Sequence, residues 1–315
     1  MAVYTPVPQD ALVDYLRHFP LGALQSYKGI EQGVSNTNYN LYTDAGHYIL
    51  TLFEPHRVKG DDIPFFLDYT DRMAQTGIPT PAVIADTDGN KVRTLCDRPA
   101  VIFNFLDGEG GHAGMITPAI MWQVGALSAR MHRAAETLTQ TQDNHFGPQR
   151  WATWLDTMGE RMDVVAPGLY ALCKKEYDGL MVLWPKDLPR GAIHGDLFPD
   201  NVFFDNGHVS GVIDFHFVCT DFFAYELAII ANAWCFDADN IFQKDRFDAL
   251  LDGYKSVRAL TAAEQGALSP FLRAAALRFL LSRAEEFINH KPDNLMKPHD
   301  PLVFLTRLKY FQSHV

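Results

Sequence analysis

One segment, about two-thirds of the way along the chain, constrains the fold most. Residues 202 to 213 read VFFDNGHVSGVI, in which two short apolar runs flank an Asn-Gly pair. This dipeptide is the strongest short-range signal for a β-hairpin. The hairpin brings Asn201, which precedes its first strand, close to Asp214, which follows its second. Asp196 lies on a loop five residues before Asn201, so we expect these three polar side chains to converge at one end of the hairpin.

These three side chains suit one kind of chemistry. A carboxylate and an amide oxygen a few ångströms apart are ligands for a hard cation that keeps some of its water, which favours Mg²⁺ over zinc. A second carboxylate beside such a metal can accept a proton from an alcohol, and phosphoryl transfer needs this set. Each residue alone has an ordinary structural explanation, but the three together around one hairpin favour a catalytic site. We expect His194 to brace the loop, because the adjacent Asp196 already supplies a base.

The first hundred residues are rich in strand patterns. Between residues 25 and 54 the strand-like runs are broken at GVSN and at DAGH, which predicts three consecutive antiparallel strands. A helix is predicted over residues 61 to 75, where apolar residues recur at spacings of three and four. Two further strands are predicted at 82 to 85 and at 100 to 105. A small sheet with one helix packed on it therefore opens the chain.

The pattern becomes mostly helical after the glycine-rich stretch DGEGGHAG at 107 to 114. Helix start signals occur at Thr117 with Pro118, at Thr261 with Glu264, and at Asp300 with Pro301. The apolar segment 222 to 236 is too short to span a bilayer and is predicted to be a core helix. We therefore predict an α+β fold of two lobes, a small antiparallel-sheet lobe at residues 1–104 and a larger, mainly helical lobe at 105–315, with ligands in the cleft between them.

The composition limits the partners. The 315 residues carry a net charge of −11, which disfavours nucleic acid and anionic membranes as partners. Four scattered cysteines, Cys96, Cys173, Cys219 and Cys235, lack the close pairing of a zinc or redox motif and predict reduced thiols, as in the cytosol. The N-terminus lacks the pattern of a signal peptide. We expect a cytoplasmic protein that acts on a small molecule.

A longer motif around the hairpin identifies a family. HGDLFPDN at 194 to 201, followed by VIDF at 212 to 215, resembles the HGDxxxxN and IDF/IDW pair of the aminoglycoside phosphotransferase and choline kinase superfamily, which is related to the protein kinases. The resemblance implies a protein-kinase-like fold. It also implies that Asp196 is the catalytic base, that Asn201 is a magnesium ligand, and that Asp214 chelates magnesium beside the phosphates of ATP.

Within that superfamily the chain looks like the bacterial homoserine kinases of the ThrB type. The matching stretches, spread from about residue 29 to 236, are QGVSNTNYNLYT, HYILTLFE, IPFFLDYTDRMAQTGIPTP, VIFNFLDG and GVIDFHFVCTDFFAYELAIIANAWCF. The resemblance implies transfer of the γ-phosphate of ATP, with Mg²⁺, to the side-chain hydroxyl of L-homoserine, a step of threonine biosynthesis.

The resemblance also implies which residues meet the nucleotide. A kinase-like loop over the phosphates corresponds to the turn GVSNTN, and a linker at the adenine ring corresponds to the end of the last sheet strand. The residues concerned are Gly33, Ser35, Asn36 and Thr37 in the turn and Asn104, Phe105 and Leu106 in the linker. One departure is Thr51, which stands where the superfamily usually has Lys or Arg. Arg57 and Lys59 are candidates to compensate, or metal and backbone suffice.

The acceptor site is less well defined by the sequence. An amino-acid alcohol needs a partner for its ammonium and another for its carboxylate. Asp221 is a candidate partner for the ammonium, but a structural role in the first turn of a helix capped by Thr220 is equally favoured. His216 is a candidate residue of the acceptor pocket. For Glu226 a structural role is favoured. No arginine stands out as the carboxylate partner. The alternatives are a kinase for choline, ethanolamine or an aminoglycoside, and a non-catalytic nucleotide-binding module.

Overall fold

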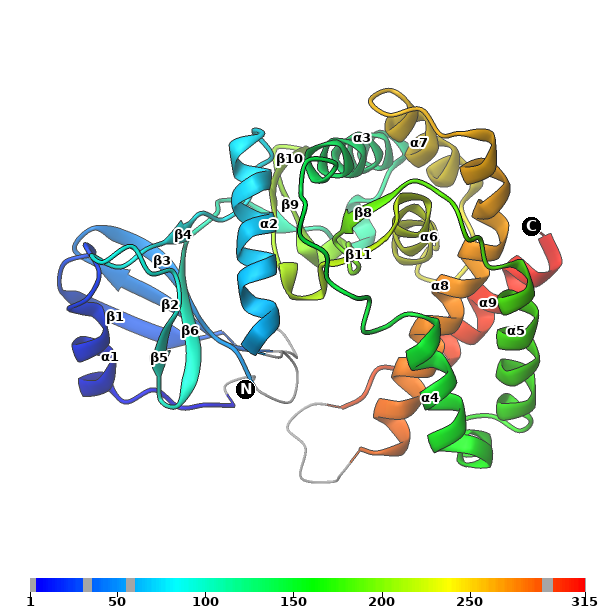
Figure 1. Ribbon diagram of the computed structural model, residues 1–315, viewed down its shortest axis with the longest axis horizontal. Helices are drawn as coiled ribbons and strands as arrows, with labels where there is room; N and C mark the ends of the chain where they lie inside the picture. Colours follow the sequence, from blue (N-terminus) through cyan, green and yellow to red (C-terminus); the bar gives the residue numbers. More distant parts are fainter. Residues whose placement is uncertain (1–3, 31–35, 55–59, 291–296, 315) are drawn as a thin grey trace. The chain divides into compact units, whose positions relative to one another are not determined.

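The computed structural model describes residues 4–30, 36–54, 60–290 and 297–314 (Figure 1). The chain forms two compact units. Unit 1 comprises Met1–Asp107 and Gly211–His216, and unit 2 comprises Gly108–Ser210 and Phe217–Val315. The boundary predicted at residue 104 lies three residues before the end of the first stretch of unit 1, and the return of 211–216 to that unit was not predicted.

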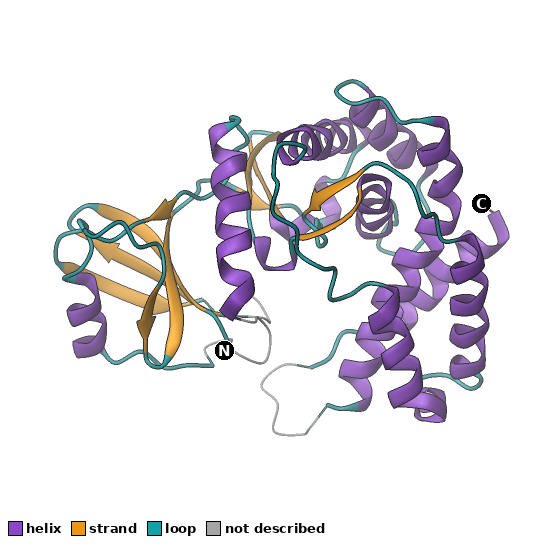
Figure 2. Ribbon diagram, viewed as in Figure 1, coloured by secondary structure: helices purple, strands orange, loops and turns teal. Residues whose placement is uncertain are grey.

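Unit 1 is built on an antiparallel sheet (Figure 2). Its order is β1-β2-β3-β6-β4, and β5 also pairs with β6. The strands are β1 (Leu24–Gly29), β2 (Thr37–Thr43), β3 (Gly46–Leu52), β4 (Val83–Ile84), β5 (Arg93–Leu95) and β6 (Arg98–Asn104). The three consecutive strands at the start and the DAGH connection are confirmed, whereas β5 was not predicted because three residues are too few to show an alternating pattern.

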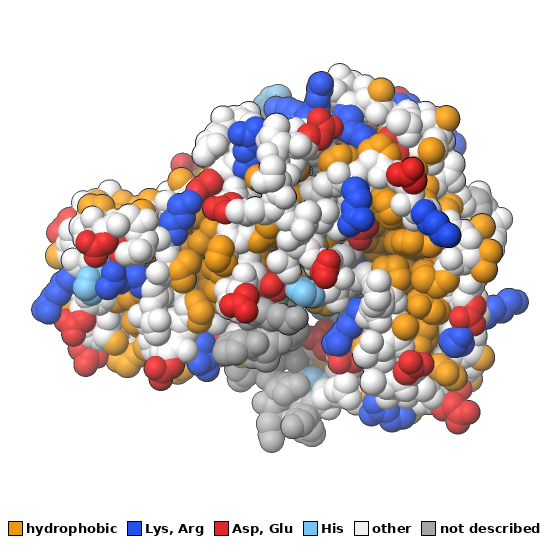
Figure 3. Space-filling view, in the orientation of Figure 1, with side chains coloured by type: hydrophobic (Ala, Val, Ile, Leu, Met, Phe, Trp, Pro, Cys, Tyr) orange, Lys and Arg blue, Asp and Glu red, His pale blue; other side chains and the backbone are white. Residues whose placement is uncertain are grey.

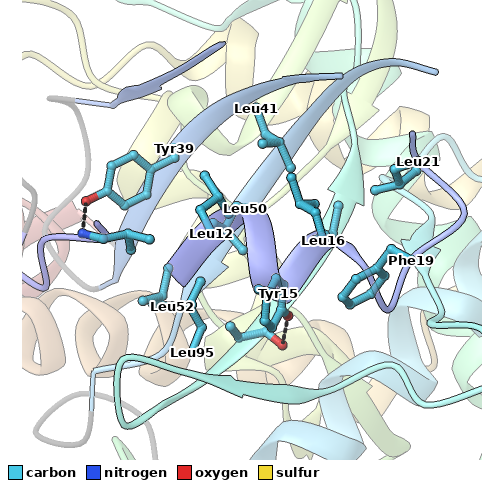
Figure 4. Packing of buried hydrophobic residues seen from close by; sticks show 13 residues of the cluster. Leu12, Tyr15, Leu16, Phe19, Leu21, Tyr39, Leu41, Leu50, Leu52 and Leu95 are labelled. Carbon is cyan, nitrogen blue, oxygen red and sulfur yellow. Dashed lines mark hydrogen bonds between the residues drawn. The ribbon is translucent and has the colours of Figure 1, made fainter. Parts of the chain in front are cut away.

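The core of unit 1 lies between this sheet and helix α1 (Gln9–Leu16). Leu12 and Leu16 of the helix are buried with Leu41 and Leu50 of the sheet (Figure 4). Alternate residues of β2 are buried, as expected when successive side chains of a strand point to opposite faces. Full burial of a leucine contributes roughly 1.5–3 kcal/mol, so this cluster holds the helix on the sheet.

Helix α2 (Ile63–Gln75) explains why the short segment 211–216 belongs to unit 1. The ring of Tyr69, which is fully buried on this helix, lies 5.7 Å from the ring of Phe215. The backbone N–H of Val212 donates a hydrogen bond to the carbonyl of Pro79 at 2.9 Å. The residues on either side of Asp214 are therefore anchored in unit 1. The helix predicted over 61 to 75 is confirmed, with a short 3₁₀ turn at Gly60–Asp62 before it.

Unit 2 is mainly helical. Its α-helices, within the described residues, are α3 (Pro118–Ala135), α4 (Pro148–Met158), α5 (Leu169–Leu183), α6 (Phe223–Trp234), α7 (Lys244–Lys255), α8 (Ala262–Ile288) and α9 (Leu302–His314). The predicted starts are confirmed: the hydroxyl of Thr117 accepts from the N–H of Ile120, and Thr261 and Glu264 form a reciprocal capping box. Helix α6, with eleven of its twelve residues buried, is the predicted core helix.

Two small sheets follow, and the last two residues of β10 in the second of them belong to unit 1. Strand β8 (Arg190–Ile193) pairs with β11 (Cys219–Phe222), and a second sheet has the order β10-β9-β7. The strands of the second sheet are β7 (Glu109–Gly110), β9 (Val202–Asp205) and β10 (His208–Val212). Asn206 and Gly207 between β9 and β10 have φ values of +48° and +78°. Two positive φ values are the signature of a type I′ turn, so the predicted hairpin is confirmed.

Two glycines allow helices α3 and α7 to touch through their backbones. A Cβ atom on Gly253 would lie 2.0 Å from the carbonyl oxygen of Trp122, and one on Gly125 would lie 2.1 Å from that of Leu250. Neither contact can be relieved by rotating a side chain, because the obstructing atoms are backbone. The approach of these helices matters for the site, because each contributes a buried polar side chain to it, as shown below.

We expect Gly253→Ala to lower the free energy of unfolding by about 2 kcal/mol, because the added methyl group forces the two helices apart. Urea denaturation measures this change. The matched control is Gly179→Ala in α5, where an added Cβ meets nothing within 4 Å. That control is expected to stabilise the protein by roughly 0.5–1 kcal/mol, because alanine suits a helix interior better than glycine. Equal midpoints for the two variants would contradict the packing described here.

The distribution of charge on the surface and the state of the cysteines agree with what the composition predicted. On the face shown in Figure 3, Lys and Arg side chains are interspersed with Asp and Glu side chains. The four cysteines are free thiols, three of them buried and Cys96 half-buried. In the part of the chain that the structure describes, no helix is both long and apolar enough to cross a bilayer.

Candidate active site

The loop after β8 carries Asp196, and a buried carboxylate holds its backbone in place. Glu226 of α6 accepts hydrogen bonds from the backbone N–H groups of His194 and Gly195, the latter at 3.1 Å. Glu226 is almost completely buried, and a carboxylate that accepts two N–H groups in such surroundings fixes the course of the chain. The sequence favoured an ordinary structural role for Glu226; the structure makes it an anchor of the loop.

Two further side chains of unit 2 hold the same loop. The guanidinium of Arg278 on α8 is buried and donates to the carbonyl of Gly195, and the indole N–H of Trp234 on α6 donates to the carbonyl of Leu197 at 2.8 Å. Gly195 has a φ of +75°, and a Cβ there would lie 2.7 Å from the carbonyl oxygen of Phe217. Glycine is therefore required at 195, and the loop has little freedom to move.

Asp196 and Asn201 are linked directly. The side-chain amide of Asn201 donates to the carbonyl of Asp196 at 2.8 Å. This bond uses the NH₂ group, so the amide oxygen of Asn201 is the atom left to accept or to ligate. The N–H of Asp196 lies 3.3 Å from Nδ1 of the fully buried His194. His194 thus braces the loop, as the sequence predicted, and Asp196 is half-buried.

Asp214 belongs to unit 1 and lies two residues after the end of β10. Its φ is +68°, a left-handed conformation that is uncommon for a residue other than glycine and that occurs often at functional sites. The side chain is exposed, and its Oδ1 atom is hydrogen-bonded to Nδ1 of His216. The side chain of His216 is buried. His216 therefore orients the Asp214 carboxylate.

The donor atoms fit a hard cation. The amide oxygen of Asn201, in unit 2, and the carboxylate of Asp214, in unit 1, are each the kind of oxygen ligand that Mg²⁺ takes beside water and phosphate oxygens. That both residues bind one ion remains a prediction. Among the described residues, no group of three or more His, Cys, Asp and Glu side chains could hold a metal by itself.

The nucleotide-loop predictions fall partly outside the described residues. Gly33 and Ser35 lie outside them, as do the candidate bases Arg57 and Lys59. Asn36 is described and buried, and its side-chain oxygen lies 3.4 Å from the backbone N–H of Glu54.

Thr37 is placed where its side chain serves the fold. It is fully buried; its hydroxyl donates to Glu54 at 2.7 Å and accepts from the backbone N–H groups of Tyr4 and Thr5. The Thr37 hydroxyl is therefore engaged within unit 1, and the assignment of Thr37 to the nucleotide loop remains a prediction. Every bond its hydroxyl can make is already made within unit 1.

Thr51, at the usual position of the kinase base, is also engaged. Its hydroxyl donates to the side-chain oxygen of Asn38 on the neighbouring strand at 2.8 Å. Among the described residues of unit 1, Arg98 Nε and Glu54 Oε2 form an ion pair at 3.2 Å. Arg98 begins β6, and its pairing with Glu54 was not predicted because the two residues are 44 positions apart.

The predicted adenine linker follows β6 in unit 1. The backbone N–H of Asn104 donates to Ala82 and that of Phe105 donates to His47, at 3.0 and 3.3 Å. The ring of Phe105 is about one-third exposed and stacks on the ring of His47 with the centroids 3.8 Å apart. An adenine ring would therefore have to use backbone groups at Leu106 or carbonyl groups of the linker. The assignment of Asn104, Phe105 and Leu106 remains a prediction.

The carboxylate of Asp221 is buried and hydrogen-bonded within unit 2, and its role toward the acceptor remains a prediction. It lies in β11, where it accepts hydrogen bonds from the side chain of Asn144 and the backbone of Phe222, both at 2.7 Å. Burial raises the pKa of Asp221, although these two bonds oppose the rise. Thr220 also lies in β11 and does not cap a helix; its hydroxyl accepts from the N–H of Gln142. The strand was missed because its partner β8 lies thirty residues earlier.

A second layer of polar groups lies behind Glu226. Nε2 of His132 on α3 is 3.8 Å from Glu226 Oε2, and its Nδ1 is 2.8 Å from the hydroxyl of Tyr254 on α7. Arg258 donates to that hydroxyl at 3.2 Å and to Glu264 at 2.8 Å. Burial lowers the pKa of His132, so its imidazole is neutral near pH 7. The loop that carries Asp196 is thus tied to α3, α6, α7 and α8.

Comparison with known proteins places this site in a family. The model of the phosphotransferase enzyme family matches residues 26–260. A homoserine kinase of Gluconobacter oxydans is 44% identical over 315 residues, which cover 99% of each chain. A homoserine kinase of Rhodospirillum rubrum is 43% identical over 313 residues, covering 99% of this chain and 97% of the relative.

Solved structures agree on the fold. Amicoumacin kinase hAmiN, in complex with AMP-PNP and Ca²⁺, superposes with a TM-score of 0.76 at 15% identity and covers 97% of this chain and 94% of its own. A microcompartment-associated aminopropanol kinase gives a TM-score of 0.68 at 17% identity, with coverage of 97% and 94%. At identities this low, the comparisons show similarity of fold alone. The predicted α+β, protein-kinase-like fold is confirmed. The sequence match, the fold and the HGD loop agree: the chain belongs to the phosphotransferase enzyme family.

Proposed function

We propose that the protein is a homoserine kinase, which transfers the γ-phosphate of ATP to the side-chain hydroxyl of L-homoserine and forms O-phospho-L-homoserine. The observation that carries the choice of acceptor is the 44% identity to a homoserine kinase over the whole chain. The geometry that supports the chemistry is the rigidly held loop bearing Asp196 beside Asn201.

The catalytic step follows from the properties of the loop. Asp196 accepts the proton of the acceptor hydroxyl while the oxygen attacks the γ-phosphorus and the bond to ADP breaks. Because the attacking group is the substrate's own hydroxyl, we expect direct transfer without a phosphoenzyme. The backbone bonds from Glu226, Arg278 and Asn201 keep the Asp196 carboxylate in place, so little reorganisation is needed during the reaction.

Asn201 and Asp214 would hold Mg²⁺, which when bound neutralises charge on the β- and γ-phosphates. His216 would act on this site by orienting Asp214. The lobe at residues 1–104 would bind the nucleotide, with Gly33, Ser35 and Asn36 over the phosphates and the linker 104–106 at the adenine. A reducing cytoplasm suits an enzyme of amino-acid biosynthesis with four free cysteines.

The acceptor distinguishes this proposal from its alternatives. Purified protein with Mg-ATP is expected to release ADP with L-homoserine and not with choline, ethanolamine or kanamycin, and EDTA should abolish the release. Coupled ADP detection measures it. Turnover with another alcohol and not with homoserine would support a kinase but would contradict homoserine as its acceptor. ATP binding without turnover of any alcohol would favour a non-catalytic nucleotide-binding module.

A further inference from the structure

Three arginines of unit 2 gather around two phenylalanine rings on α8 and α9. The guanidinium of Arg278 lies 4.4 Å from the ring centre of Phe279, and those of Arg283 and Arg307 lie 4.4 and 4.8 Å from that of Phe304. The two rings are stacked with their centroids 5.0 Å apart. Positive charge is therefore concentrated at one place in unit 2.

Among the residues that the structure describes, one of the three arginines has no polar partner. Arg278 donates to the carbonyl of Gly195, and Arg307 donates to the side chain of Asn240 at 2.7 Å and to a backbone carbonyl. Arg283 makes no hydrogen bond and no ion pair within 4 Å to any residue that the structure describes. Its stacking on Phe304 holds the guanidinium plane while leaving its N–H edge for another partner.

Arg283 lies next to the catalytic loop. Phe198, two residues after Asp196, packs edge-on against Phe279 with the ring centroids 4.9 Å apart. Arg283 follows Phe279 by four residues on α8, one helical turn or about 6 Å further along the axis. Among the opposing charges that act on Arg283, the carboxylate of Asp196 is the largest, ahead of Glu286 and Asp300.

The electrostatic surroundings of Arg283 favour a bound anion. Burial lowers its pKa, and the Asp196 carboxylate only partly opposes this change. Burial, followed by repulsion from Arg283, also lowers the pKa of Arg307 to about 10. A half-buried guanidinium without a direct counter-ion is costly to maintain. A ligand anion that forms a two-point contact with the guanidinium edge would relieve that cost.

The size of homoserine matches this position. Its hydroxyl oxygen and carboxylate carbon are separated by four bonds, a span of roughly 5 Å when extended. Adding a hydrogen bond of about 2.8 Å at each end places the carboxylate partner within roughly 10 Å of the Asp196 carboxylate. Arg283 lies one turn along α8 from the ring that Phe198 contacts, and it is close enough to Asp196 for that carboxylate to be its largest opposing charge.

We propose that Arg283 binds the α-carboxylate of the acceptor and so selects an amino-acid alcohol over an amino alcohol that lacks the carboxylate. This inference rests on the proposed function, because it takes the acceptor hydroxyl to be at Asp196. Arg283 is a specificity-determining residue in this account, and it takes no part in the proton transfer.

The test compares two acceptors and three variants. L-Homoserine and L-homoserine amide differ only in the charge of the group that Arg283 would bind. Steady-state kinetics with each acceptor, and with varied ATP, are measured for the wild type, Arg283→Met and Arg283→Lys. The matched control is Arg273→Met on the same helix, because Arg273 is already paired with Glu176 at 2.7 Å.

The wild type is expected to prefer homoserine to its amide by about 100-fold in kcat/KM, the scale of losing a charge-assisted pair. Arg283→Met should abolish that preference by raising KM for homoserine, with KM for ATP and turnover of the amide unchanged. Retained turnover of the amide also shows that the variant is folded. Arg283→Lys should keep roughly one-tenth of the preference, since an ammonium lacks the planar two-point contact. Arg273→Met should show the same preference for homoserine over its amide as the wild type.

Two outcomes would overturn the inference alone. Equal losses for both acceptors with a raised KM for ATP would mean that Arg283 binds a phosphate of the nucleotide. An unchanged preference in Arg283→Met would mean that another residue binds the carboxylate. Failure of the wild type to phosphorylate homoserine at all would overturn the proposed function together with this inference.

Discussion

The variant Asp196→Asn is expected to lose about 10³-fold in kcat for homoserine phosphorylation, because an amide cannot accept the proton of the attacking hydroxyl. The backbone of the loop is held by Glu226, Arg278 and Trp234, none of which contacts the side chain at 196 in these bonds. Its course is therefore expected to survive the substitution. ATP binding, measured by calorimetry, should remain within about 3-fold of wild type.

The control for this variant is Asp205→Asn, which changes an exposed carboxylate at the end of β9. It removes the same charge from the same part of the chain and is expected to retain the wild-type rate. If Asp196→Asn kept more than one-tenth of the wild-type kcat while Asp205→Asn behaved as expected, Asp196 would not be the base.

The second large effect is expected from Glu226→Gln, in both stability and rate. Glutamine offers one acceptor oxygen where two backbone N–H groups now bind two carboxylate oxygens, and its NH₂ group would face a donor. A buried N–H group left without a partner lowers the free energy of unfolding, here by about 3 kcal/mol. The loop is also expected to become mobile, so that kcat falls on the order of 100-fold. Urea denaturation and steady-state kinetics measure the two effects.

The variant Glu176→Gln is the control that separates a loss of protein stability from a loss of positioning of the catalytic loop. Glu176 is also a buried carboxylate of unit 2, but its hydrogen bonds go to Arg273 and Gln312. This control should lose stability to a similar extent and keep its kcat at temperatures where it is folded. If both variants kept their kcat, Glu226 would serve the fold without positioning the catalytic loop.

Local patterns in the sequence were enough for most of the fold. The Asn-Gly turn, the capping box of Thr261 and Glu264 and the alternation in β2 each depend on a few adjacent residues, and each was found as predicted. Strand β11 was mistaken for the start of a helix, because its only strand partner is β8. Short strands stabilised by distant partners leave little local signal.

The candidate site likewise contains residues that a local motif identifies and residues whose role depends on distant contacts. The motif HGDLFPDN fixes Asp196 and Asn201 by itself, since the two residues are linked through a bond spanning five positions. Glu226 was undervalued because an acid in the first turn of a helix is favoured by the helix dipole in any case, and its contacts lie 31 and 32 residues away.

Thr37 and Arg283 show how distant contacts change a residue's role. Thr37 is a small polar residue of the kind that suits a phosphate loop, but its hydroxyl donates a hydrogen bond to Glu54, 17 positions later. Arg283 could not be singled out among the arginines of α8, because what distinguishes it is that no described residue is its direct polar partner, which only the fold reveals.

The central claim is that this protein forms O-phospho-L-homoserine by direct transfer from ATP. The most direct measurement is identification of the phosphorylated product, by phosphorus NMR and mass spectrometry, after incubation of the protein with Mg-ATP and L-homoserine. The account predicts a phosphate monoester on the side-chain hydroxyl, formed in equal amount with ADP and formed about 10³-fold more slowly by Asp196→Asn. Release of free phosphate without a phosphorylated amino acid, or the same product from Asp196→Asn at the wild-type rate, would contradict it.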